Sequence, residues 1–211
     1  MSLFLGKIHY WLFNKIQWFE GLEREVIALA EKSSLDVETL KKEITAKYGE
    51  MTPNKPLEEM IDTSNIHGWL QGKIHAAEGR MAAWTNALLG LNDEKINEGL
   101  KNVYIEQGIK AGKEVAAEGK IDSAEDIYTA IEDYVLDGMP CDRVNEVTES
   151  SSDKLSYVRT ICVHKDVWAR EDVDVKVFYD LRKLWIENFV KSINPEFTFT
   201  EEGNNMTIER K

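Results

Sequence analysis

The stretch that decides the fold is IHYWLFNKIQWFEG, residues 8–21, because it returns as IHGWLQGKIHAAEG at residues 66–79. Eight of the 14 aligned positions are identical, whereas unrelated stretches share about one, so we infer that a helical unit was duplicated. At about 100° per residue, seven of the eight shared residues fall on one half of a helix. The shared histidine, lysine and glutamate therefore lie on or beside the buried face, where an unpaired charge is costly.

Within one copy the histidine and the glutamate are 11 residues apart, about 16 Å along a helix, so they cannot share a ligand. We expect the two helices to pack antiparallel about a pseudo-two-fold axis. That arrangement places His9 near Glu78 and Glu20 near His67. The simplest interpretation is structural, with two buried hydrogen-bonded pairs that fix the register of the helices.

A ligand or metal site built on the repeat is the alternative. A ligand pocket would be lined by His9, Trp11, Glu20, His67, Trp69 and Glu78. A divalent metal would use His67, His75 and Glu78, since His75 and Glu78 are one turn apart on one helix face. The Glu-x-x-His pair of di-iron bundles is absent, because Gly72 and Ser64 stand three positions before the two histidines.

Two further features of the repeat concern packing. Trp11 and Trp69 occupy equivalent positions in the two copies, so core packing is their simplest role and ligand contact the alternative. Gly68 and Gly72, one turn apart, predict that a neighbouring helix comes close there.

Helical spacing dominates the first two-thirds of the chain. It predicts helices from Leu3 to about Lys32, from a cap at Ser34 to Tyr48, from Asn65 to Leu91, from a cap at Asn92 to Gly119, and from a cap at Ser123 to Leu136. The mixed charges of the fourth helix indicate a solvated surface helix.

The pattern changes at DGMPC, residues 137–141. Residues 141–150 and 154–166 are rich in valine, isoleucine and threonine and predict two strands. A helix from Asp172 or Asp174 and a hairpin over residues 196–210 follow. We therefore expect an α+β fold, with a helical region over residues 1–138 packed in one compact domain on a mostly antiparallel β-β-α-β-β layer over residues 139–211.

The second predicted strand carries a candidate catalytic pair, Cys162 and His164. Two residues apart on a strand, they would share a face with side chains about 7 Å apart. A thiol beside an imidazole can act as nucleophile and base, or as two metal ligands. Cys141, on the preceding predicted strand, would strengthen such a cluster. The simpler interpretation is a buried cysteine near an edge histidine.

Three segments carry a resemblance to a known family: YVRTICVH (157–164), VFYDLRKLWIENFVKSINP (177–195) and FTFTEEGNNMTIER (197–210). Their layout resembles the C-terminal part of the L-2-amino-thiazoline-4-carboxylic acid hydrolase-like proteins and, more remotely, 4-vinyl-reductase-type ligand-binding domains. The resemblance covers about a third of the chain and implies a cytosolic α+β domain that holds a small organic molecule. The family's closing hairpin carries a glycine followed shortly by a cysteine, whereas Asn204, Asn205 and Met206 follow Gly203 here, which leaves hydrolysis open.

Composition narrows the class of protein. The net charge of −12 disfavours binding to nucleic acid and to anionic membranes. Two cysteines suit a reducing compartment, and no apolar run approaches the roughly 20 residues of a membrane span, so a cytoplasmic location is predicted. Signatures of nucleophilic serine hydrolases, Cys-x-x-Cys sites and phosphate-binding loops are missing from the sequence.

Together these observations predict a cytoplasmic small-molecule-binding or hydrolase-like protein. The first alternative is a non-catalytic interaction or structural protein, in which the repeat serves packing or homodimer formation. The second is a metal-dependent enzyme that uses His9, His67, His75, Glu20 and Glu78.

Overall fold

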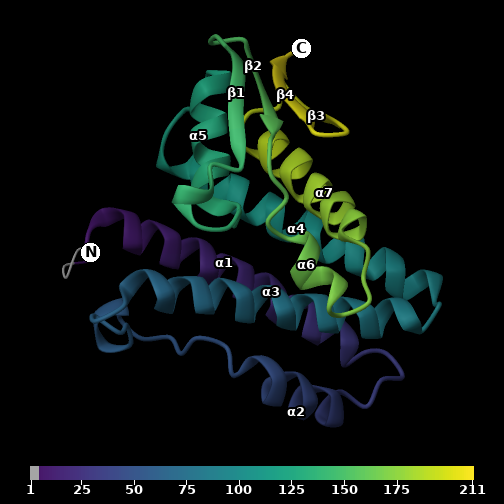
Figure 1. Cartoon of the computed structure of the whole chain (residues 1–211). Coiled ribbons are helices and arrows are strands. Elements are labelled where there is room, and N and C mark those ends of the chain that lie inside the picture. The colour runs from purple at the N-terminus through teal and green to yellow at the C-terminus, as the bar shows by residue number, and fades with distance from the viewer. Residues whose placement is uncertain (1–4) are drawn as a thin grey trace.

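A computed structural model describes residues 5–211 and shows helices followed by a C-terminal sheet (Figure 1). The helices are α1 (Lys7–Ala30), α2 (Val37–Tyr48), α3 (Ile66–Gly90), α4 (Glu94–Glu118), α5 (Ala124–Tyr134), α6 (Lys165–Ala169) and α7 (Val175–Ile193). The strands are β1 (Asn145–Ser150), β2 (Lys154–Arg159), β3 (Phe197–Glu202) and β4 (Asn205–Arg210). This architecture confirms the predicted α+β class. Leu3, the predicted start of the first helix, lies outside the described residues.

Helix starts follow side chains that accept hydrogen bonds from the first turn. Ser123 caps α5, as predicted, and Asn65 and Asp174, two of the predicted helix starts, cap α3 and α7. The predicted caps at Ser34 and Asn92 are wrong by one or two residues, because Asp36 and Asp93 accept those bonds instead. None of the helices in residues 5–211 combines the length and the apolar character that a membrane crossing requires.

The two copies of the repeat form the N-terminal halves of α1 and α3, which pack side by side (Figure 1). The helices run parallel, not antiparallel as predicted. His9 lies beside His67 near both helix starts, and Glu20 lies beside Arg80 further along. Residues 31–65, including α2, return the chain to the starting end. Four of the shared apolar residues, Leu12, Ile16, Leu70 and Ile74, meet in a small core with their neighbours, whereas Ile8 is exposed.

The most extensive helix contact joins α4 to α7. A Cβ atom at Gly108 would lie 2.3 Å from the carbonyl oxygen of Trp185, and one at Gly112 would lie 2.5 Å from that of Phe189. Only glycine allows this approach. The prediction that α4 is simply a solvated surface helix is therefore wrong for one face, since Leu100, Tyr104 and Ala111 are buried. The close approach expected at Gly68 and Gly72 does not occur within residues 5–211. Both glycines are exposed, the atoms nearest an added Cβ at Gly68 belong to Asn65, and one at Gly72 would meet no atom within 4 Å.

All strands of the C-terminal sheet pair antiparallel, in the order β1-β2-β4-β3. Alternate residues of the inner strands, such as Tyr157 and its partner Met206, face the core, where α5 and α7 cover the sheet. β2 ends at Arg159, so the longer predicted strand is wrong. Residues 160–164 form a loop that leads into α6, and Cys141 lies in a 3-10 turn, Pro140–Asp142, before β1.

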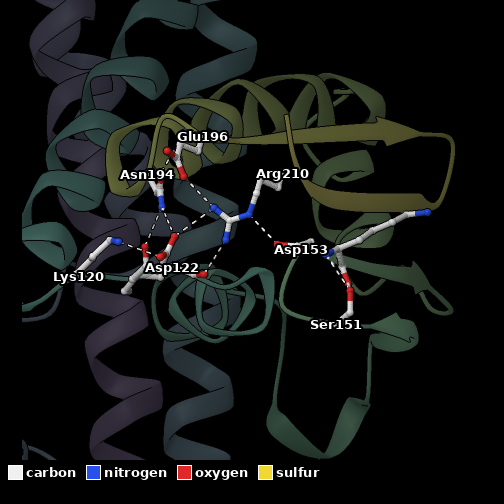
Figure 2. Close-up of polar contacts among 9 residues, drawn as sticks. Lys120, Asp122, Ser151, Asp153, Asn194, Glu196 and Arg210 are labelled. Carbon is white, nitrogen blue, oxygen red and sulfur yellow. Dashed lines mark hydrogen bonds and ion pairs between the residues drawn. The ribbon is translucent and has the colours of Figure 1, made fainter.

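A half-buried arginine joins four segments at the far end of the sheet (Figure 2). Arg210 of β4 donates to Asp153 Oδ1 at 2.7 Å, to Glu196 Oε2 at 2.8 Å and to the carbonyl oxygen of Asp122 at 2.9 Å. These partners lie in the β1–β2 turn, the α7–β3 junction and the α4–α5 loop. Because the acidic side chains of this cluster are exposed, we interpret it as a structural contact that holds these segments together rather than as a functional site.

Candidate functional site

The two repeat histidines contact each other instead of glutamates. The backbone N–H of Gly6 donates to His9 Nδ1 at 2.9 Å, which places the proton of a neutral His9 ring on Nε2. That Nε2 lies 3.4 Å from His67 Nε2. His9 is buried, whereas His67 is exposed. The predicted pairs His9–Glu78 and Glu20–His67 are therefore wrong.

Glu20 belongs to a buried cluster centred on Arg80. Arg80 Nη2 donates to Glu20 at 2.7 Å, and Arg80 Nε donates to Glu23 at 2.9 Å. Glu20 also accepts from the backbone N–H of Thr52 at 3.0 Å. Burial raises the pKa of Glu23 to about 7, although Arg80 opposes the shift. Two carboxyls around one guanidinium thus tie α1 to α3 and to the return segment.

Glu78 faces the other side of α3 and contacts His164. Glu78 Oε1 lies 3.0 Å from His164 Nδ1, and Asp137 Oδ1 lies 2.8 Å from His164 Nε2. Arg182 Nη1 donates to the same Asp137 oxygen at 2.6 Å. These four side chains, hereafter the His164 network, link α3, α6, α7 and the loop after α5 through a ring that is fully shielded from solvent.

The His164 network balances two carboxylates against two cations. Burial alone would lower the pKa of His164, but Glu78 and Asp137 outweigh it and raise the pKa to about 9. For Asp137 the effects are reversed. Burial alone would raise its pKa, but Arg182 and His164 hold the pKa far below its usual range. Asp137 is therefore a fixed anion at neutral pH.

Asp137 also forms part of a polar cleft of about 280 Å³ between α1, α5 and the segment that leads into β1. We call it the Lys15 cleft; its polar lining is Lys15, Tyr128, Glu132, Asp137, Arg143 and Asn145, and Trp11 closes one side. The Asn145 amide lies 3.3 Å from Asp137 Oδ2 and 3.4 Å from Glu132 Oε1. One carboxylate thus connects the His164 network to the cleft.

Lys15 is the unusual group of this cleft. Its side chain is 3% exposed, yet it makes no ion pair or hydrogen bond with any of residues 5–211. Its ammonium lies 4.0 Å from the centroid of the Trp11 ring, one helical turn earlier. The Trp11 indole N–H donates to Asp133 Oδ1 at 2.7 Å, which fixes the ring against α5.

The ionisable groups of the cleft are shifted in opposite directions. Burial lowers the pKa of Lys15, although Glu132 and Asp137 oppose the shift. Burial raises the pKa of Glu132, although Lys15 opposes it. The pKa values of the amine and the acid are thus shifted toward each other, a pattern that proton-transfer sites use.

Cys162 and His164 do not share a face. Cys162 is exposed, whereas His164 is buried within its network. Burial alone would raise the pKa of the Cys162 thiol, but the Tyr179 hydroxyl, 3.2 Å from Sγ, and the backbone N–H groups of His164 and Lys165 outweigh it and lower the pKa. The predicted shared face is wrong, and the catalytic role of the pair stays a prediction.

The predicted metal ligands are not brought together. His67 and His75 are exposed, while Glu78 is buried against His164. Within residues 5–211, no group of three or more His, Cys, Asp or Glu side chains has a geometry that could hold a metal ion. Coordination through His9 Nε2 would move its proton to Nδ1 and break the bond from Gly6.

A larger open groove of about 830 Å³ runs between α1 and α4. Its lining alternates exposed lysines and glutamates with Trp18 and Gln107, and it contains no buried, unpaired charge among the described residues. The Lys15 cleft is smaller but chemically more distinctive, so we take it as the candidate site.

Of the predicted ligand-lining residues, only Trp11 reaches the Lys15 cleft. Trp69 packs near Phe13 in the small core, with ring centroids 6.2 Å apart. Sequence patterns did not predict the other lining residues of the cleft, which are Lys15, Tyr128, Glu132, Asp137, Arg143 and Asn145. A signal for Lys15 was present, since it is one of the three ionisable residues on the buried arc of the repeat.

Comparison of the chain with protein-family models, with curated proteins and with solved structures finds no match.

Proposed function

We propose that this protein binds a small polar organic molecule in the Lys15 cleft. The observation that carries the proposal is the buried Lys15, which faces the cleft without an ion pair to any described residue. Lysine is rarely buried unless it is paired, so an acceptor group on a ligand is the missing partner.

The lining sets the chemistry of that molecule. Lys15 and Arg143 offer positive charge, whereas Asp137 and Glu132 offer carboxyl oxygens. A ligand that fits carries an acceptor for Lys15 and a donor for the carboxyl groups, with an apolar portion against Trp11. A volume of about 280 Å³ admits a molecule of amino-acid size.

Thermal unfolding with a panel of small acids, amino acids and heterocycles tests the proposal. We expect at least one compound to raise the melting temperature in a concentration-dependent way. Asn145→Ala and Glu132→Gln should reduce that shift, whereas Gln107→Ala, in the α1–α4 groove, should leave it unchanged. The proposal fails if no compound stabilises the protein, or if the groove variant alone removes the effect.

A hydrolase-like activity is a second candidate, favoured by the lowered thiol pKa of Cys162. A thiolate is the reactive form, so Cys162 should react with iodoacetamide at neutral pH faster than Cys141, which is also exposed. Peptide mapping of the alkylated protein measures both rates in one sample. Equal rates would remove the support for Cys162 as a nucleophile.

A further inference from the structure

We propose that Lys15 forms an imine with the carbonyl group of a small aldehyde or ketone held in the Lys15 cleft. This inference rests on the proposed binding function and names the chemistry of the acceptor group. It concerns a residue that both copies of the repeat contain, but that only one copy places in a cleft.

The internal duplication supplies the first argument. Lys15 and Lys73 are equivalent residues, and each lies over the tryptophan of its own copy, at 4.0 and 5.3 Å from the ring centroid. Lys73 is half-buried and lines none of the cavities described above, whereas Lys15 is 3% exposed and lines the cleft. The cation–π contact occurs in both copies, so it explains why both contain the lysine. It does not explain why Lys15 alone is buried in a cleft.

The groups around the Lys15 amine also bear on its reactivity. An ion pair would hold Lys15 protonated, but no carboxylate of residues 5–211 lies within ion-pair distance of it. A desolvated amine without a partner favours its neutral, nucleophilic form, in agreement with the lowered pKa of Lys15. Glu132, which also lines the cleft, has a raised pKa and can supply a proton.

The reaction balances with groups that the cleft contains. The lone pair of Lys15 Nζ attacks the carbonyl carbon, and the electrons of the C=O π bond move to oxygen, which takes a proton from Glu132. Nitrogen then returns a proton to Glu132, which gives a neutral carbinolamine. The carbinolamine hydroxyl takes that proton from Glu132 and leaves as water while the nitrogen lone pair forms the C=N bond. The amine, the carbonyl compound and the Glu132 proton thus yield one protonated imine, one water and the Glu132 carboxylate.

The cleft also suits the product. A protonated imine is a cation, and it would lie over the Trp11 face that now receives the ammonium. Asp137 remains ionised because Arg182 and His164 hold it so, and it provides a fixed negative charge in the same cleft. The site thus stabilises the charge that imine formation develops.

Reductive trapping tests the inference. The protein is incubated at neutral pH with propanal, or separately with pyruvate, in the presence of sodium cyanoborohydride, and peptide mapping by mass spectrometry follows each lysine over time. We expect Lys15 to be alkylated at least about tenfold faster than Lys73, because a desolvated amine is deprotonated more often than a half-exposed one. Lys73→Arg should leave the fast label in place, and Lys15→Arg should abolish it.

The controls separate this inference from the binding function. Circular dichroism confirms the fold of each variant, and Lys15→Met replaces Lys15→Arg if the larger guanidinium unfolds the chain. Labelling spread evenly over surface lysines, with Lys15 no faster than Lys73, overturns the inference. If panel compounds bind while Lys15 is not trapped, the imine fails and the binding function stands. If Lys15 is trapped quickly but no panel compound raises the melting temperature, the imine stands and the cleft takes carbonyl compounds rather than the ligands of the panel.

Discussion

The two copies of the repeat begin from almost the same residues and end in different surroundings. In α1 the shared glutamate, Glu20, joins Arg80, whereas in α3 its counterpart Glu78 joins His164. The lysines divide in the same way, with Lys15 buried in a cleft and Lys73 half-buried at the surface.

The difference comes from what covers each copy. α1 packs against α4 and α5, whereas α3 packs against α2 and α6. The apolar residues that face the twin copy meet as a matched set in one small core. Both copies therefore keep the apolar face that packs on the other copy. The other helices that cover each copy decide the role of its polar residues.

The largest expected effect concerns the charge that joins the copies. Arg80→Met leaves Glu20 and Glu23 buried without their counter-charge and should lower the free energy of unfolding by about 3–5 kcal/mol. Arg24→Met, on the exposed side of α1, should change it by less than about 0.5 kcal/mol. Urea unfolding at neutral pH measures both. Similar losses in the two variants would mean that the buried cluster does not join the helices.

The His164 network, which serves only the α3 copy, should make stability depend on pH. The folded pKa of His164 is raised from 6.5 to about 9, so its contribution is complete below about pH 6.5 and is lost as the pH rises through 9. At about 1.4 kcal/mol per pKa unit, the loss amounts to roughly 2–4 kcal/mol. Urea titrations at pH 6.5, 8 and 10 follow it, and His164→Gln should lack this slope. A stability that rises over this range contradicts the prediction.

The shared glycines should respond with opposite signs. A Cβ at Gly79 would lie 2.3 Å from the Tyr48 ring of α2, whereas one at Gly21 would meet the end of Gln107 at 3.5 Å. Gly79→Ala should destabilise the protein by about 1–3 kcal/mol. Gly21→Ala should stabilise it by up to about 1 kcal/mol, since alanine favours a helix interior. Thermal unfolding of the two variants decides whether both glycines serve the same purpose.

The smallest effect tests whether Lys15 serves stability at all. The Lys15 amine is buried and pairs with no carboxylate of residues 5–211. Lys15→Met therefore removes a desolvation cost and should raise the free energy of unfolding by about 1 kcal/mol. The matched Lys73→Met should change it by no more than about 0.5 kcal/mol. A clear loss of stability in Lys15→Met would show that the lysine is a structural cation.

The sequence predicted the fold class and most elements because periodicity and caps are local signals. Asn65, Ser123 and Asp174 act as caps through contacts within three residues, so their roles follow from neighbours in the chain. The loop at Cys162 and the short helix α6 were missed because valine, isoleucine and histidine there continue the strand pattern after Arg159.

The candidate site was harder to predict because its parts are distant in sequence. The repeat showed that Lys15 faces inward, but not that Glu132 and Asp137 would face it across a cleft. The direction of the second copy was also undetermined. Parallel packing depends on the 35-residue return from 31 to 65, whose path is set by Tyr48 against Gly79 and by Thr52 on Glu20.

One oxygen of Asp137 takes part in two hydrogen bonds, and this makes one wall of the cleft rigid. Its Oδ1 is held by His164 and Arg182, so the carboxylate cannot rotate toward an incoming molecule without breaking two buried bonds. Only Oδ2, now 3.3 Å from the Asn145 amide, can change its partner. A ligand must place its hydrogen-bond donor where Oδ2 already points. This wall therefore selects ligands by their fit to a fixed geometry and does not adjust to each of them.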